Sequence, residues 1–236
     1  MGRGAHEGRP RSLFPWIVAT AMAAMASSIA IAVHHAPVWG DVGVAQRVQA
    51  AYGLPQIAAV INELGGPWQW LYGLGAIVLL LTGLRIGGGL AGSQLRREAL
   101  WASLAAAALR PASGIIKDLV ASPRPAPAFG IRVDELRDSF GFPSGHVYGD
   151  VLVLGVLAVY ARAFLTPRFV EPFRVLVVVV LVAAGPSRVV AGAHWPSDVL
   201  GGYLWGTLAL LIAIAVGRWG GRRRWDLLNR RTRPSA

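Results

Sequence analysis

The chain of 236 residues is 54% hydrophobic and 15% charged, with a mean hydropathy of +0.49; a soluble domain usually carries about 25% charged residues, so the composition indicates a polytopic membrane protein. The absence of cysteine excludes disulfides, thiolate chemistry and Cys-ligated zinc. The net charge is +11, but the basic residues cluster beside long apolar runs and lack an interleaved reading face, which favours membrane topology signals over nucleic-acid binding.

Six apolar segments are long enough, or nearly long enough, to cross a bilayer, which needs roughly 20 helical residues. They are about 13–33, 68–86, 98–116, 147–165, 173–191 and 199–217. The first could instead be a signal peptide, but its apolar run exceeds the roughly 7–15 residues of a signal core, so we expect a retained helix. Arg110 and Pro111 interrupt the third, where we expect a kink, with Arg110 facing protein or water.

The sequence therefore predicts an all-α, six-transmembrane-helix bundle over residues 13–217. A basic tail at 1–12 and an Arg-rich tail at 218–236 flank it. With six crossings, sixteen Lys and Arg residues fall on the side of the two tails and six fall on the other side. The positive-inside rule then places both termini in the cytoplasm. The Arg-rich C-terminal tail is expected to lie on the membrane surface, and a partner-binding role for it stays open.

The predicted outward side has three connections. They are about 34–67, 117–146 and 192–198. The first contains a mildly amphipathic stretch over residues 57–64, which we expect to lie on the membrane surface. His34 and His35 form a pair in the same connection; we expect interfacial histidines there, with a metal site as the alternative.

Three cations lie near the ends of predicted helices on the outward side: Lys117, Arg124 and Arg188. Converging cations repel one another unless an anion lies between them. Phosphate suits this place because Arg offers a planar fork of donors and Lys a point charge. Ser144 and Gly145 precede a predicted helix, so their backbone N–H groups and the positive end of the helix dipole can also hold phosphate.

Two histidines have separate roles to fill beside this anion site. His194 and Asp198 are spaced i, i+4, which brings them within side-chain reach on a helical turn. A carboxylate on one ring nitrogen fixes the tautomer and leaves the other nitrogen as a nucleophile. His146 can stay protonated and donate to a leaving oxygen. Asp150, one turn further, either tunes His146 or makes a polar contact within the helices; both interpretations stay open.

These residues follow one another in a three-part pattern. The parts are Lys117-x6-Arg124-Pro125, then Pro143-Ser144-Gly145-His146, then Ser187-Arg188-x5-His194-x3-Asp198. The pattern resembles, without substitution, the signature of the type 2 phosphatidic acid phosphatase superfamily. That superfamily includes lipid phosphatases, bacterial acid phosphatases, glucose-6-phosphatase and vanadium haloperoxidases. The six-helix layout extends the resemblance over roughly 13–217 and fits the membrane lipid phosphatases, because the acid phosphatases and haloperoxidases are soluble.

The resemblance implies a role for each residue of the pattern. His194 would be the nucleophile that becomes phosphorylated, Asp198 would orient it, and His146 would protonate the leaving group and then activate water. The phosphoryl oxygens would be bound by Lys117, Arg124, Ser144, Gly145 and Arg188. Since these cations neutralise the charge of the transition state, no metal or cofactor is expected. Ser187 belongs to the pattern without an evident role.

The expected function is removal of phosphate from a lipid phosphate or polyprenyl diphosphate at the outer membrane face, with the lipid substrate and membrane lipids as partners. Candidate substrates are polyprenyl diphosphate, phosphatidylglycerophosphate and phosphatidate; a polyprenyl-diphosphate-like or phosphatidate-like lipid is favoured over a soluble sugar phosphate. An oxidising enzyme that uses bound vanadate would need the same cations but no membrane. A non-enzymatic lipid-anion binder or transporter would need neither histidine. The sequence defines neither pathway nor oligomeric state.

Overall fold

The structure is a computed structural model that describes residues 12–51, 59–63, 73–75, 90–134 and 138–231. Its main helices are α1 (Phe14–His34), α2 (Asp41–Ala51), α5 (Leu90–Leu109), α6 (Ala112–Val120), α7 (Gly145–Val159), α8 (Pro167–Val190) and α9 (Pro196–Arg231). Two 3₁₀ turns, Pro127–Phe129 and Ala161–Ala163, lie before and after α7. The all-α expectation is confirmed within these ranges.

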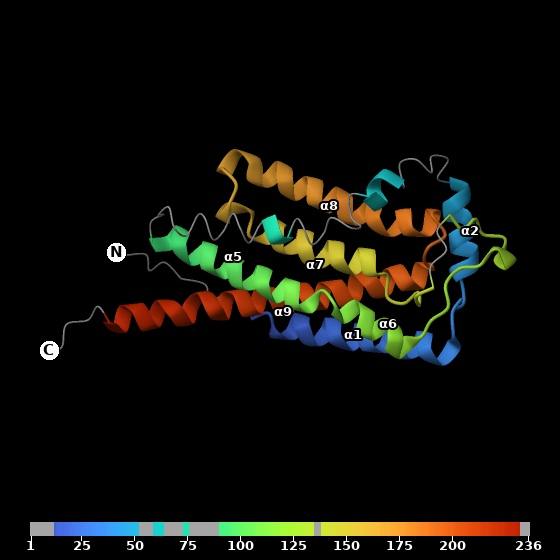
Figure 1. The fold of residues 1–236 in the computed structure, drawn as a ribbon, viewed down its shortest axis with the longest axis horizontal. Helices are drawn as coiled ribbons and strands as arrows, with labels where there is room; N and C mark the ends of the chain where they lie inside the picture. The colour runs from blue at the N-terminus through green and yellow to red at the C-terminus, as the bar shows by residue number, and fades with distance from the viewer. Residues whose placement is uncertain (1–11, 52–58, 64–72, 76–89, 135–137, 232–236) are drawn as a thin grey trace, which may run out of the picture.

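The long helices α1, α5, α7, α8 and α9 run side by side, and α2 lies across one end of the bundle (Figure 1). α9 occupies the middle, where it contacts α1, α5, α7 and α8. α1 begins, and α9 ends, toward the end of the bundle that is remote from α2 (Figure 1). The connections that carry the predicted site residues lie at the α2 end.

Among the described residues, four helices are long and apolar enough to cross a membrane: Phe14–His34, Gln94–Val120, Pro167–Val190 and Pro196–Gly221. α7 is apolar but shorter, because the chain turns into 3₁₀ geometry after Val159 instead of continuing to the predicted 165. α8 begins at Pro167, earlier than the predicted 173, since proline suits the first turn of a helix. The predicted span at 68–86 lies outside the described residues except for 73–75.

The predicted kink at Pro111 is confirmed as a break between two helices. Proline has no N–H to continue the backbone ladder, so α5 ends at Leu109 and α6 begins two residues after Arg110. The Tyr148 hydroxyl donates to the Leu109 carbonyl at 2.6 Å, which supplies a partner at the end of α5. Arg110 Nη1 lies 3.4 Å from Ser113 Oγ, so this cation has a protein partner as expected. The break directs α6 toward the α2 end.

Close packing of α7 on α9 depends on glycine. A Cβ atom on Gly206 would lie 2.9 Å from Val151 Cβ and 3.0 Å from the Tyr148 carbonyl oxygen. A Cβ on Gly202 would lie 2.9 Å from the Ser144 carbonyl oxygen. Small residues spaced four apart let helix backbones approach closely in membranes. The start of α7, which carries His146, and the start of α9, which follows His194, are held together in this way.

Candidate active site

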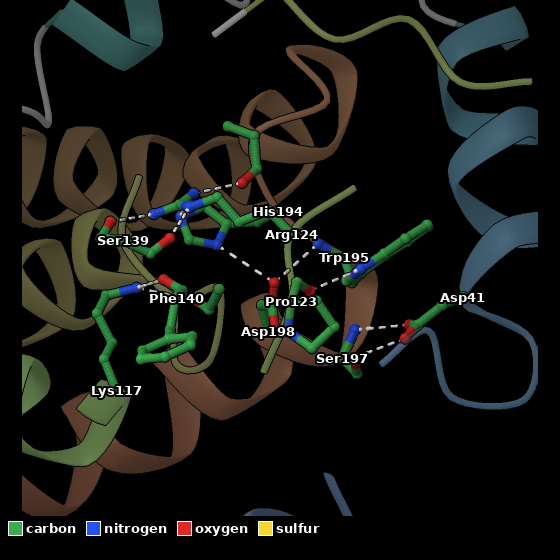
Figure 2. Close-up of polar contacts among 12 residues, drawn as sticks. Asp41, Lys117, Pro123, Arg124, Ser139, Phe140, His194, Trp195, Ser197 and Asp198 are labelled. Atoms are coloured by element: carbon green, nitrogen blue, oxygen red, sulfur yellow. Dashed lines mark hydrogen bonds and ion pairs between the residues drawn. The ribbon is translucent and has the colours of Figure 1, made fainter. Parts of the chain in front are cut away.

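All the residues of the three-part pattern meet at the α2 end of the bundle. They come from α6, from the connection between α6 and α7, from the first turn of α7, and from the segment that runs from the end of α8 to the start of α9. Figure 2 shows part of this group: Lys117 from α6, Arg124 from the connection, and His194 beside Asp198. The structure therefore brings together segments that are distant in the sequence.

His194 and Asp198 form the predicted i, i+4 pair. The Nδ1 atom of His194 lies 3.4 Å from Asp198 Oδ2, and both side chains are almost completely buried. The same carboxylate oxygen accepts the backbone N–H of Trp195 at 3.0 Å. This arrangement favours the tautomer with the proton on Nδ1, and it leaves Nε2 available on the opposite side of the ring.

Arg124 faces that nitrogen. Its Nη1 atom lies 3.3 Å from His194 Nε2 and donates to the Ala193 carbonyl at 2.6 Å. On the other side of the guanidinium, Nε donates to the Ser139 carbonyl at 2.6 Å and Nη2 to Ser139 Oγ at 2.9 Å. Because hydrogen bonds hold both edges of the Arg124 guanidinium, this group is fixed next to the unprotonated Nε2 of His194.

Lys117 lies in the last turn of α6 and holds the loop before α7. Its Nζ atom donates to the carbonyls of Phe140 and Gly141, at 2.8 and 2.9 Å (Figure 2). A Cβ atom on Gly141 would lie 2.6 Å from Asp198 Oδ2, so only glycine lets this loop approach the carboxylate so closely. Gly141 is a site residue that sequence reasoning missed, because one glycine in a loop carries no signal of what it packs against.

The N-terminus of α7 forms another wall of the site. Ser144 N–H donates to the Asp198 carbonyl at 2.9 Å, which joins the start of α7 to the start of α9. The buried Ser144 hydroxyl has no hydrogen-bond partner within the described residues. Gly145 is the first residue of α7, and His146, in the same turn, is half-buried. A hydroxyl and the N–H groups of a helix N-terminus suit an anion.

Arg188 lies in the last turn of α8 and is only 1% exposed. Its neighbour Ser187, whose role the sequence left open, has Oγ 2.7 Å from Asn62 Oδ1 and 2.8 Å from the Ala184 carbonyl, and can donate to either. Asn62 belongs to the helical residues 59–63, within the stretch that was predicted to lie on the membrane surface. Ser187 thus joins this stretch to the end of α8 beside Arg188.

Burial lowers the pKa of His194 well below its ordinary value of 6.5. Four neighbouring groups lower it further: Lys117, Arg124, Arg188 and His146. The cations predicted from the sequence and the second histidine thus all act on the pKa of this one imidazole. The neutral ring, which is the nucleophilic form, is therefore the form present at neutral pH.

The structure also places the two remaining candidates from the sequence, the His34–His35 pair and Asp150. His34 ends α1 and His35 follows it, and both side chains are exposed. Asp150 is buried in α7, one turn after His146. Sequence reasoning also missed Asp41, whose carboxylate accepts the Ser197 N–H at 2.9 Å and the Ser197 hydroxyl at 2.7 Å. No local pattern indicates that contact, because it joins residues 156 positions apart.

Comparison with known proteins supports the resemblance of the three motifs. The sequence profile described as PAP2 superfamily matches residues 98–222, which include every residue of the three-part pattern. A transmembrane PAP2-type phosphatidylglycerolphosphate phosphatase from Bacillus subtilis, known from a crystal structure, is similar in fold, with a TM-score of 0.65 and 23% identity over 92% of this chain and 98% of that one. No curated protein sequence matches. The chain therefore belongs to the PAP2 superfamily.

Proposed function

We propose that the protein removes phosphate from a lipid phosphate or polyprenyl diphosphate through a phosphohistidine formed on His194, without a metal. The observation that carries this proposal is the position of the His194 ring. Its Nδ1 faces Asp198 at 3.4 Å, while its Nε2 lies 3.3 Å from a donor of Arg124. A phosphoryl oxygen bound to Arg124 brings the phosphorus atom next to the nucleophilic nitrogen.

In the first half-reaction, the Nε2 lone pair attacks phosphorus. The N–P bond forms as the bond between phosphorus and the lipid oxygen breaks, and His146 donates its proton to that oxygen. A lipid alcohol leaves from a monophosphate, and a lipid monophosphate leaves from a diphosphate. Asp198 stabilises the positive charge that develops on the His194 ring through the Nδ1 proton.

In the second half-reaction, water attacks the phosphorus of phosphohistidine. His146, now neutral, takes a proton from the water as the new P–O bond forms. The N–P bond breaks, its electron pair returns to Nε2, and inorganic phosphate leaves. His146 is protonated again at the end, so one histidine supplies and recovers the proton of the whole cycle.

Three cations would stabilise the charge on the transferring phosphoryl group: Lys117, Arg124 and Arg188. Fixed donors are worth more in a site that excludes water than in solution, and Arg188 is almost completely buried. These cations supply the neutralisation that magnesium gives in nucleotide-dependent phosphoryl transfer. We therefore expect full activity in EDTA.

The proposal places the site at the extracytoplasmic face, with six crossings over 13–217 and cytoplasmic tails at 1–12 and 218–236. The Lys and Arg distribution supports this orientation. The start of α1 and the end of α9 both point away from the site (Figure 1), which agrees with termini on one side of the membrane. α9 continues to Arg231, so the first part of the C-terminal tail extends the last helix.

The substrate proposal is a lipid whose phosphate reaches the site while its tails remain in the bilayer. The relative from Bacillus subtilis is a phosphatidylglycerolphosphate phosphatase, which makes a phospholipid phosphate one candidate. Polyprenyl diphosphate and phosphatidate are the other two, and a polyprenyl-diphosphate-like or phosphatidate-like lipid is favoured over a soluble sugar phosphate.

The test is phosphate release by purified protein in detergent with EDTA from phosphatidate, phosphatidylglycerophosphate and polyprenyl diphosphate. We expect turnover of at least one lipid substrate, and no turnover by His194→Ala at equal expression. Strict dependence on magnesium would contradict the metal-free mechanism. Near-normal activity of His194→Ala would show that another group is the nucleophile.

A further inference from the structure

The helix α2 crosses the site end of the bundle and contacts both α8 and α9. Its inward face carries Asp41, Ala45 and Gln49, spaced i, i+4 and i+8. Asp41 and Ala45 are buried, although the helix lies in the first predicted connection, residues 34–67. We propose that α2 is a brace for the nucleophile: Asp41 and Gln49 are positioning residues that hold the α9 and α8 ends of the loop 191–195, which carries His194. This inference rests on the proposed role of His194.

At one end of the brace, Asp41 caps α9. The helix starts with Pro196, and Trp195 before it has no side-chain acceptor for the N–H groups of the first turn. Asp41 Oδ1 accepts the Ser197 N–H at 2.9 Å, and Oδ2 accepts the Ser197 hydroxyl at 2.7 Å (Figure 2). The negative carboxylate also suits the positive end of the helix dipole. Ser197 directly precedes Asp198, so the cap acts on the turn that holds the carboxylate partner of the nucleophile.

At the other end, Gln49 binds the end of α8. Its Nε2 lies 3.3 Å from the Val189 carbonyl and 3.2 Å from the Val190 carbonyl, the last two residues of the helix. The same amide donates to the Arg132 carbonyl at 2.8 Å and accepts the Arg132 N–H at 2.9 Å. Arg132 Nη2 in turn donates to the Val190 carbonyl at 3.1 Å. The carbonyls that follow Arg188 therefore have partners from α2 and from the connection before α7.

The loop between these two ends has little freedom of its own. Gly192 has a φ of +63°, and a Cβ atom there would collide with the Arg132 carbonyl oxygen. The Ala191 carbonyl accepts the Asp134 N–H at 3.0 Å, and Ala193 N–H donates to the Arg188 carbonyl at 3.1 Å. The backbone on both sides of His194 is thus anchored, and two of the anchors come from α2. The contact between the His194 ring and Asp198 is 3.4 Å long, too weak to set the ring position alone.

A brace of this kind predicts an effect on turnover that exceeds its effect on substrate binding. Lys117 and Arg124 lie on other segments, so removing the α9 cap leaves most of the phosphate cradle in place. Displacing a nucleophile by a fraction of an ångström to one ångström costs about tenfold to hundredfold in rate. A residue with a purely structural role would instead lower the melting temperature and leave the rate per folded molecule unchanged.

The experiment uses the full chain in detergent with EDTA and, as the substrate, whichever of phosphatidate, phosphatidylglycerophosphate and polyprenyl diphosphate the unchanged protein turns over fastest. Asp41→Asn removes one acceptor oxygen, Ser197→Ala removes the hydroxyl that binds it, and Gln49→Ala removes the amide at α8. The matched control is Arg47→Gln, a change of an exposed polar side chain on another face of the same helix. Turnover, KM, melting temperature and hydrogen exchange of the 191–199 backbone are measured for each variant.

We expect Asp41→Asn to lower kcat about tenfold with KM within about twofold of the unchanged protein, and to speed exchange in 191–199. Gln49→Ala is expected to speed exchange in the same segment. Ser197→Ala should give a smaller loss, and the Asp41→Asn, Ser197→Ala double variant should lose less than the sum of the two, since both remove one contact. Arg47→Gln should match the unchanged protein.

The proposal is overturned if Asp41→Asn and Ser197→Ala keep normal kcat and normal exchange, or if Arg47→Gln shows the same losses. If Asp41→Asn does not fold, Ser197→Ala decides between these outcomes on its own. If the unchanged protein has no activity in EDTA, the proposed function fails. Hydrogen exchange in 191–199 still decides whether α2 braces the loop, because it does not depend on catalysis.

Discussion

His194 lies between the Asp198 carboxylate and the Arg124 guanidinium, and its side chain is buried. Burial disfavours the charged imidazolium, and the neighbouring cations disfavour it further. Both effects act in the same direction and lower the pKa of His194. A neutral ring with one nitrogen bonded to a carboxylate is the form that can attack phosphorus.

This pKa direction predicts where activity is lost on acidification. The lowered pKa means that the neutral, reactive ring persists to lower pH than for an ordinary histidine. We therefore expect the acid limb of kcat/KM that belongs to His194 to lie below pH 6.5. Substrate phosphates also ionise in this pH range, so the pH profile of kcat/KM is measured with both a monophosphate lipid and a diphosphate lipid. A limb at or above pH 6.5 that is the same for both would contradict the assignment.

Arg188 is the cation for which substitution has the clearest expected result. Because its side chain is buried next to the site, Arg188→Ala should lower kcat/KM by about 100-fold, roughly 3 kcal/mol. Arg188→Lys should have a kcat/KM between those of the unchanged protein and Arg188→Ala, since lysine keeps the charge and loses the planar fork of donors. Arg174 of the same helix is the control: it forms a surface ion pair with Glu171 at 2.8 Å. Arg174→Ala should stay within about twofold, and equal losses at the two positions would refute the role of Arg188.

The residues that touch phosphate in the proposed mechanism could be predicted from the sequence. The residues that hold them in position could not. The i, i+4 spacing of His194 and Asp198 is a local property, and the structure forms that pair. Asp41 and Gln49 act on segments far along the chain, and nothing in their own surroundings indicates those partners. Gly141 is similar, because the need for glycine arises only from the approach of Asp198.

Among the elements, α9 is the one on which the others depend. Its glycines let α7 approach closely enough to join the Ser144 N–H to the Asp198 carbonyl. The break between α5 and α6 followed from Pro111 alone, whereas the early end of α7 did not follow from hydropathy. An apolar sequence continues past Val159, but the hydrogen bonds change to 3₁₀ geometry there. Hydropathy reports which segments favour lipid and cannot report where a helix ends.

The packing of α7 on α9 leads to a stability prediction. Gly206→Ala places a methyl group 3.0 Å from the Tyr148 carbonyl, which cannot move without separating the helices, so the free energy of unfolding should fall by about 1–3 kcal/mol. Gly114→Ala is the matched control, because a Cβ there meets nothing within 4 Å. It should leave stability unchanged or raise it by up to about 1 kcal/mol. Melting temperatures in detergent compare the two, and equal shifts would show that the close contact does not limit packing.

For the whole molecule, the positive-inside count and the positions of the chain ends give one expected orientation. A reporter fused after Ala236 should read as cytoplasmic, and a reporter inserted in the connection that carries Arg124 should read as external. The second fusion serves as the internal control for the first. An external reading after Ala236 would contradict the six-crossing arrangement or its orientation.

The measurement that tests the central claim most directly is isolation of the phosphorylated enzyme. The variant His146→Ala is mixed in EDTA with a radiolabelled aryl phosphate, whose leaving group needs no proton, so the first half-reaction proceeds while hydrolysis of the intermediate is slowed. We predict a label that is stable in alkali, lost in acid, located on the peptide that contains His194 and absent from the His194→Ala, His146→Ala double variant. An acid-stable label, or a label on any other residue, would contradict the account.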